Sequence, residues 1–230
     1  MSEGKNRTVV VYRALRRAIL EQALQPGTKL PEDAIGEQFC VSRTLARRAL
    51  EMLAADEIVD IRPNRGASVA KPSLEEARDI FQVRMDIEHL IVARVVGKLT
   101  RKEIQRLELG VDAEERSHRE GREEYIRHAA EFHILIAELA GSPLFLRYLT
   151  ALVSRSALIL GLYGRPSWTN CSVHEHRALI GALGGTDVAH AQELMRAHLD
   201  AVLTRALESA HVEAGRGIRD VLAAYAGSRD

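Results

Sequence analysis

Several features that define specialised classes of protein are scarce or missing in this sequence of 230 residues. It has two cysteines, Cys40 and Cys171, which lie far apart. This argues against a disulfide scaffold and fits a reducing cytoplasm. Six prolines and 16 glycines are too few for a collagen-like or low-complexity chain. No apolar run reaches the roughly 18–20 residues of a membrane span, and the polar residues 1–7 do not resemble a secretory signal peptide. We therefore expect a cytoplasmic protein without a membrane segment.

The formal net charge is zero, because 32 basic residues balance 32 acidic ones. The positive and negative residues are distributed unevenly along the chain. Residues 1–74 hold 12 Lys and Arg against 9 Asp and Glu, and residues 75–230 hold 20 against 23. The positive excess in the N-terminal part is a weak indication of a polyanionic partner, and random scatter of charges explains it about as well. What is present is a globular composition, with 46% hydrophobic and 28% charged residues.

The first 70 residues have the pattern of three helices followed by a β-hairpin. Apolar side chains recur at helical spacing in the three helices, and Ser42 is a suitable N-cap for the third. A short β-rich run, a turn that contains Pro63 and Gly66, and a second short run predict the hairpin. The helices are expected over 8–22, 31–39 and 43–55, and the strands over 58–61 and 67–70.

Beyond residue 72 the sequence has helix patterns and caps but no strand signal. Three pairs have the spacing of a capping box: Ser73 with Glu76, Thr100 with Glu103, and Ser172 with Glu175. Short breaks between the helices predict an antiparallel bundle. The helices are expected over about 73–96, 100–120, 123–140, 142–163, 172–183 and 186–213, with a short tail helix over 216–225.

The third helix and the hairpin carry the residue types of a DNA reader. Two helices joined by a tight turn, with arginines in the first turns of the second, have the layout of a helix-turn-helix. Arginine can bind guanine through two hydrogen bonds, and serine and threonine can bind phosphate or base. A basic solvated helix beside a plain hairpin is the alternative. The expected DNA contacts are Ser42, Arg43, Thr44, Arg47 and Arg48 in the helix, and Arg62, Arg65 and Gly66 in the hairpin.

Several separated motifs resemble the DNA-binding domain of the GntR family of bacterial transcription regulators. They are Pro26-Gly27, Leu30-Pro31, Ser42-Arg43-Thr44, Arg47, Ala49-Leu50 and Arg65-Gly66-Ala67-Ser68-Val69. The resemblance implies a winged helix-turn-helix that binds a double-stranded DNA operator. The sequence departs from the family at Arg48, which replaces an acidic residue, and at Asp33, where some relatives carry an arginine that contacts DNA. These departures imply a different operator.

Residues 75–205 resemble the all-helical, FCD-type ligand-sensing domain of the FadR subfamily of these regulators. The matching motifs are Arg84-x-x-Ile87-Glu88, Phe132-His133, His176-x-x-Leu179-Ile180, Asp187 and Met195-x-x-His198. Many members bind a divalent metal through one aspartate and three histidines. The resemblance implies the ligands His133, His176 and His198, for Zn²⁺, Ni²⁺, Fe²⁺ or Mn²⁺, but the position of the aspartate is Ala129.

The residue pattern around these histidines also supports an interior position without the resemblance. Each histidine shares an apolar helical stripe, so all three are expected to face the bundle interior, where a satisfied core histidine is the alternative to a metal ligand. Arg84 also lies on an apolar stripe, and a buried arginine needs an anion. Either Glu88 or the carboxylate of an effector can supply it. With no aspartate at position 129, we expect a small carboxylate to complete the site next to Arg84.

We therefore predict a mostly α protein with a winged helix-turn-helix over 1–71 and an all-helical effector-binding and dimerisation domain over 72–230. It is expected to be a homodimeric repressor and not an enzyme. One alternative is the same regulator with a metal-free site for an acyl or apolar ligand. The other is a metal-dependent hydrolase, which lacks an acidic base, because Glu131 and Glu175 are expected to face away from the histidines.

Overall fold

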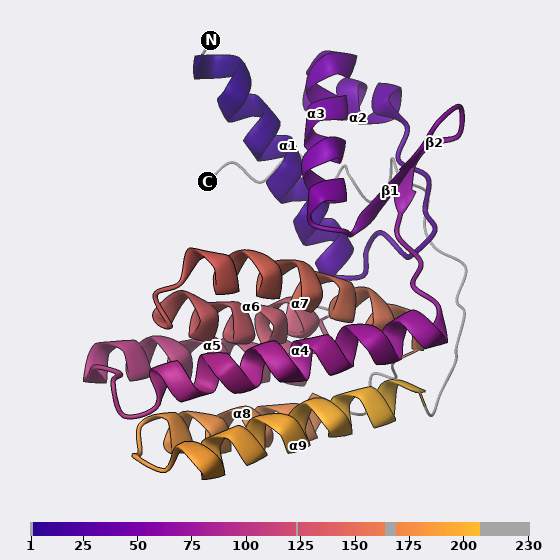
Figure 1. Cartoon of the computed structure of the whole chain (residues 1–230). Coiled ribbons are helices and arrows are strands. Elements are labelled where there is room, and N and C mark those ends of the chain that lie inside the picture. The colour runs from indigo at the N-terminus through magenta and orange to yellow at the C-terminus, as the bar shows by residue number, and fades with distance from the viewer. Residues whose placement is uncertain (1, 123, 164–168, 208–230) are drawn as a thin grey trace. The chain divides into compact units, whose positions relative to one another are not determined.

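The computed structural model describes residues 2–122, 124–163 and 169–207. They are mostly helical, with one two-stranded antiparallel hairpin (Figure 1). Two compact units are formed, one by the described residues up to Lys71 and one by those from Pro72 onward. The predicted fold class, a helix-turn-helix with a small hairpin followed by a helical bundle, is confirmed.

The first unit contains three helices and the hairpin. Their bounds are α1 Ser2–Leu20, α2 Glu32–Phe39, α3 Arg43–Ala55, β1 Val59–Arg62 and β2 Gly66–Val69. The core lies where α1 packs on α3, through fully buried residues such as Leu15, Ile19, Leu50 and Leu53. The first helix begins at Ser2 and not at residue 8 as predicted. Residues 2–7 contain no helix breaker apart from Gly4, so the helix extends beyond the apolar stripe that revealed it.

The turn between α2 and α3 depends on two backbone positions. Cys40 adopts a left-handed conformation with φ of 51°, and its N–H bonds back to α2. A Cβ on Gly36 would lie 2.9 Å from the carbonyl oxygen of Val41, so glycine permits the close approach of the two helices. Ser42 then accepts a hydrogen bond from the N–H of Leu45 at 3.3 Å, which confirms it as the N-cap of α3.

The hairpin pairs Val59 with Val69 and Arg62 with Gly66. Gly66 has φ of +74°, a conformation that favours glycine, and a Cβ there would meet no atom within 4 Å. The chain after Pro26 runs along the other side of β2, where the N–H of Leu30 donates to the carbonyl of Ala67 at 2.9 Å. The wing is thus anchored to the segment that leads into α2.

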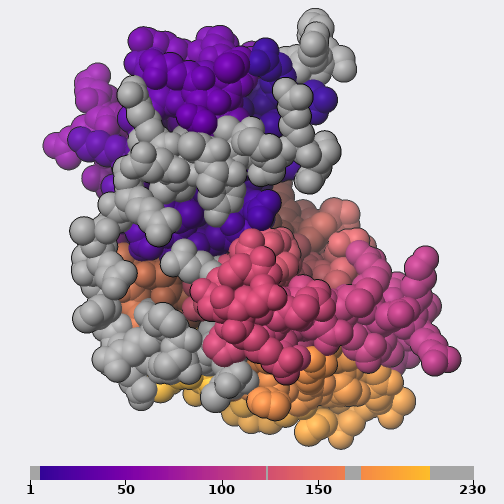
Figure 2. All heavy atoms as spheres, turned by 180° about the vertical axis from the view of Figure 1, so that it is seen from behind, coloured from indigo at the N-terminus to yellow at the C-terminus, as the bar shows by residue number. Residues whose placement is uncertain are grey.

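The second unit is a bundle of helices. Their bounds are α4 Leu74–Val95, α5 Arg101–Arg119, α6 Glu124–Leu139, α7 Pro143–Tyr163, α8 Thr169–Leu183 and α9 Val188–Leu207. Neighbouring pairs include α4 with α9, α5 with α6, and α8 with α9. Figure 2 shows the face on which side chains of α5 and α6 are exposed beside α8 and α9.

Two of the three predicted capping boxes are present, at Ser73 and at Thr100. The third prediction is wrong, because α8 begins at Thr169 and Ser172 lies inside the helix. Its hydroxyl group donates to a carboxylate oxygen of Glu114 at 3.1 Å instead of capping the helix. The predicted tail helix over 216–225, and the last predicted turns of α9, lie outside the described residues.

Helix α7 is long and apolar enough to cross a membrane, by its length and composition alone. No such segment was expected from the sequence, because no uninterrupted apolar run reaches the length of a membrane span. In the structure α7 packs against α4, α6 and α9, and seven of its residues, among them Leu149, Val153 and Ile159, are buried. This packing is that of a core helix of the bundle.

Candidate functional site

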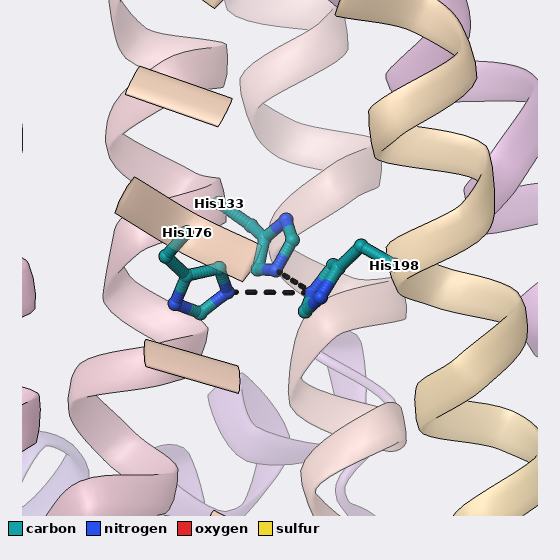
Figure 3. Close-up of side chains that lie close together, drawn as sticks. All are labelled: His133, His176 and His198. Atoms are coloured by element: carbon teal, nitrogen blue, oxygen red, sulfur yellow. Dashed lines mark hydrogen bonds between the residues drawn. The ribbon is translucent and has the colours of Figure 1, made fainter. Parts of the chain in front are cut away.

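Three histidines from three helices converge inside the bundle (Figure 3). His133 lies on α6, His176 on α8 and His198 on α9, and each side chain is at most 4% exposed. The Nε2 atom of His198 lies 3.3 Å from that of His176 and 3.2 Å from that of His133. The structure therefore brings together all three histidines that the sequence proposed as metal ligands.

Each histidine is held from behind by a glutamate of a different helix. The Nδ1 atom of His133 lies 2.6 Å from Glu88 on α4, that of His176 lies 2.7 Å from Glu114 on α5, and that of His198 lies 2.6 Å from Glu175 on α8. A carboxylate only accepts hydrogen bonds, so each Nδ1 carries the proton and each Nε2 lone pair faces the centre.

This set of carboxylates was not predicted from the sequence. Glu88 was considered only as a partner of Arg84, and Glu114 was not considered at all. The prediction that Glu175 faces away is wrong, because α9 approaches α8 on the side of Glu175 and His198 bonds to it. The i, i+4 spacing of Arg84 and Glu88 was the one local signal that the sequence carried.

Two arginines balance part of the negative charge. Arg84 donates from Nε to Glu88 at 2.6 Å, and both side chains are buried. Arg205 donates to both carboxylate oxygens of Glu175 at 2.9 and 3.0 Å. Of the two partners expected for Arg84, the structure contains Glu88, and Arg84 also lines the cavity beside the histidines.

The environment keeps His133 and His198 neutral and Glu88 and Glu175 ionised. Burial lowers the pKa of His133 well below its usual value and that of His198 to about 4, although Glu88 and Glu175 oppose this. Burial raises the pKa of Glu88, but the electrostatic attraction of the His133 N–H group and of the Arg84 charge, with the hydrogen bonds from both, outweighs it and lowers this pKa to about 2. Hydrogen bonds from His198 and Arg205 likewise outweigh burial and lower the pKa of Glu175 to about 2.

The donor set fits a divalent metal ion. Three buried lone pairs point at one another, and neutral imidazoles whose only N–H is used by a carboxylate have no proton to share between them. Two nitrogens that each lie about 2.0–2.1 Å from a tetrahedral ion are about 3.3 Å apart. The observed separations of 3.2 and 3.3 Å match this value. A satisfied core histidine would have a donor opposite its inner nitrogen.

A cavity of about 50 Å³ lies beside the histidines. Apart from the histidines and Arg84, its wall is apolar or small, with two serine hydroxyls. Ala129 is part of this wall, one helical turn before His133, so the space that an aspartate would occupy is open. The other lining residues are Ile126, Ala130, Val153, Ser156, Ala157, Leu160, Ser172 and Val202.

The proposed DNA-binding residues lie in the first unit, on the first two turns of α3 and in the wing. Ser42 is the N-cap of α3, and Arg43, Thr44, Arg47 and Arg48 are exposed on the helix. Arg43 forms an ion pair with Asp33, and Arg47 with Glu32, both on α2. In the hairpin, Arg62, Arg65 and Gly66 are exposed, and Arg62 lies 3.7 Å from Asp60.

Two family models match the chain. Residues 7–69 match "Bacterial regulatory proteins, gntR family", and residues 79–201 match the FCD domain. The chain belongs to the GntR family of regulators that carry an FCD domain. This family regulates transcription and does not consist of enzymes, which agrees with the prediction made from the sequence and removes the hydrolase alternative.

Several transcriptional repressors are similar to this GntR-family chain. It is 30% identical to the repressor RspR of Escherichia coli K12 over 135 residues, which are 58% of this chain and 59% of RspR. The repressor GlaR of the same strain is 27% identical over 202 residues, 82% of this chain and 90% of GlaR. The repressor NanR of Cronobacter sakazakii is 26% identical over 222 residues, 86% and 84% of the two chains.

Solved structures have the same fold. A GntR transcriptional regulator from Rhodococcus sp. RHA1 superposes with a TM-score of 0.77 at 21% identity, over 90% of this chain and 100% of the other. McbR/YncC of E. coli superposes with a TM-score of 0.71 at 22% identity, over 86% and 93% of the two chains.

Proposed function

We propose that this protein is a cytoplasmic, ligand-responsive repressor of transcription, of the FadR subfamily. The first unit would bind a double-stranded operator through α3 and the wing. Relatives that are repressors, among them RspR and NanR, support repression as the direction of regulation. An effector in the bundle would change the population of DNA-binding conformations, which is allostery by population shift.

The bundle would sense its effector through a divalent metal held by His133, His176 and His198. The observation that carries this proposal is the convergence of three Nε2 lone pairs, each fixed by a glutamate on Nδ1. Neutral imidazoles suit Zn²⁺, Ni²⁺, Fe²⁺ or Mn²⁺. The metal would supply a positive centre with at least one position left for an exogenous ligand.

A small carboxylate is the effector class that the charges favour. The three glutamates and the two arginines around the histidines leave one net negative charge, and a divalent ion would change it to one net positive charge. A single carboxylate would neutralise the site, and Ala129 leaves room for it. Because Glu88 already balances Arg84, the metal itself would be the main anchor of the effector, with Arg84 beside it.

The effector-binding unit would also form the homodimer. Four large apolar side chains are 47–63% exposed on the packed pair α4 and α7: Val83, Leu90, Leu144 and Tyr148. The exposed Asp86 and Arg147 flank them on the two helices. A second copy related by two-fold symmetry would cover this apolar face and bring acidic and basic side chains together, and a two-fold dimer matches a two-fold operator.

Metal analysis of the purified protein tests the sensing proposal. About one divalent ion per chain is expected, and titration calorimetry should show carboxylates binding to the metal-loaded protein. Equal carboxylate affinity after removal of the metal by a chelator would contradict the metal bridge. It would favour the metal-free site for an acyl or apolar ligand.

A further inference from the structure

The two arginines at the start of α3 are each held by a carboxylate from α2. Arg47 donates from Nε to Oε1 of Glu32 at 2.7 Å and from Nη2 to Oε2 at 3.1 Å. Arg43 forms an ion pair through Nε with Asp33. All four side chains are 30–75% exposed, so the pairs lie on the surface where α3 would meet DNA.

The bidentate pair leaves one edge of the Arg47 guanidinium free. A guanidinium has five N–H donors in one plane. Glu32 uses the Nε–H and one hydrogen of Nη2, and the edge formed by Nη1 and Nη2 is not used by it. Such an edge can donate two parallel hydrogen bonds, the geometry with which arginine binds O6 and N7 of guanine.

Glu32 is a fixed anchor for this arrangement. It lies in the first turn of α2, where the helix dipole favours a carboxylate. The close approach at Gly36 holds α2 against the segment before α3. The side chain of Arg47 is therefore held at its Cα atom by α3, and its guanidinium is held by Glu32 of α2.

We propose that Glu32 and Asp33 are positioning residues for base recognition, which fix Arg47 and Arg43 so that each presents a defined donor edge to a guanine. This inference rests on the proposed DNA-binding function. Neither residue would touch the base itself. The selectivity of the operator would depend on carboxylates that the sequence analysis did not assign to DNA binding.

Two other arginines of the DNA-binding surface, Arg48 and Arg65, fit this division of roles, whereas Arg62 in the wing lies 3.7 Å from Asp60. Within the described residues, Arg48 and Arg65 have no carboxylate partner within ion-pair distance. An unpaired cation neutralises a phosphate, whereas an arginine paired with a carboxylate adds little net charge to the surface. Paired arginines are thus suited to reading bases, and unpaired ones to binding the backbone.

The competing explanation is that the carboxylates only occupy the arginines in the free protein. A competitor must be displaced before DNA binds, so its removal would tighten binding and leave the sequence preference unchanged. A positioning residue keeps its contact in the complex, so its removal would lower selectivity. Loss of a competitor should therefore change the affinity for DNA, and loss of a positioning residue should change the sequence selectivity.

Binding-site selection from a library of random-sequence DNA duplexes tests the proposal with the full-length protein. The wild type, Arg47→Ala, Glu32→Ala and Glu32→Gln are compared, and Glu51→Gln is the matched control. Glu51 lies one turn after Arg47 and adds negative charge near it without a hydrogen bond. Arg47→Ala identifies the base pair that Arg47 reads, and thermal melting verifies that each variant folds.

Glu32→Ala should lower the preference for guanine at that base pair by about tenfold, within the range of a lost bidentate contact. Its binding to unselected DNA should be unchanged or tighter, Glu32→Gln should be intermediate, and Glu51→Gln should keep the preference. If Glu32→Ala retains the preference and binds more tightly, the carboxylate is a competitor and the inference is wrong. If the wild type selects no sequence, the proposed function itself fails.

Discussion

Both units of this protein orient nitrogen side chains with carboxylates from another helix, but they do so in different surroundings. In the first unit, α2 holds Arg43 and Arg47 at the surface. In the second, three glutamates hold three histidines that are at most 4% exposed. Exposed ion pairs contribute about 0–1 kcal/mol, because water and salt screen them. A buried group that loses its partner costs several times more.

The comparison indicates that the same contact serves two purposes. At the surface, a carboxylate can fix the direction of an arginine with little effect on folding. In the bundle, the carboxylates determine which nitrogen of each histidine is protonated and are needed for the site to exist. Substitutions in the bundle should therefore have larger effects on stability than substitutions in the surface pairs.

The largest effect is expected from removing a proposed metal ligand. His176→Gln should abolish stoichiometric metal in elemental analysis. It should also remove the stabilisation by metal, which is about 4 kcal/mol for an ion present at a thousand times its Kd. His174→Gln is the matched control, because His174 is exposed on the same helix two residues away. Metal content equal to the wild type in His176→Gln would exclude the histidine cluster as the metal site.

Acid should destabilise the metal-free protein through the buried histidines. The pKa of His198 is lowered to about 4 in the folded state, against about 6.5 in an unfolded chain. The unfolded state therefore binds the proton first, and stability falls as the pH drops from about 6.5 to about 4. The loss from His198 is about 3 kcal/mol over this window.

Denaturant unfolding of the chelator-treated protein at several pH values measures this effect. His198→Gln cannot bind the proton, so its stability should depend less on pH in the same window. A wild type and variant with parallel pH profiles would show that His198 is not buried in its neutral form.

The carboxylates behind the histidines should have the next largest effect. Glu114→Gln keeps an acceptor for His176 but removes the charge, and we expect metal affinity to fall by about 10- to 100-fold. Glu115→Gln is the control at the neighbouring position, since Glu115 binds Arg177 and Arg119 at the surface. Competition with a chromophoric chelator gives both affinities. Equal losses in the two variants would mean that charge alone, without contact to His176, is responsible.

A smaller effect is expected at Ala129, where the wall of the cavity is open. Ala129→Asp would add a carboxylate one turn before His133, so we expect metal affinity to rise by about tenfold and carboxylate binding to weaken. Ala129→Asn has a similar size without the charge and serves as the control. Calorimetry with acetate as the probe, on both metal-loaded variants, distinguishes charge from bulk. Unchanged acetate binding in Ala129→Asp would place the effector elsewhere.

The sequence predicted what depends on local contacts. Ser42 caps α3 through a bond three residues away, and two capping boxes were recognised in the same way. The inward direction of the histidines followed from their apolar stripes. Glu88 and Glu114 could not be assigned, because 45 and 62 residues separate them from His133 and His176. Which glutamate faces which histidine depends on how the helices pack.

The smallest effect should come from the surface pair, and it makes the comparison sharpest. Glu32→Ala should change the free energy of unfolding by less than about 1 kcal/mol, because the pair is exposed and water replaces the lost contact. Arg47→Ala should be similar, and the double variant should show little coupling between the two residues in the free protein. Denaturant unfolding at low and high salt measures the free energies of unfolding of the single and double variants, which give the coupling energy. This coupling energy should decrease as salt screens the pair.

A coupling energy of several kcal/mol would mean that the pair helps to fold the first unit and does not only orient Arg47. A small coupling in folding, together with a lost preference for guanine on DNA, would show that a carboxylate can determine operator choice while contributing little to stability.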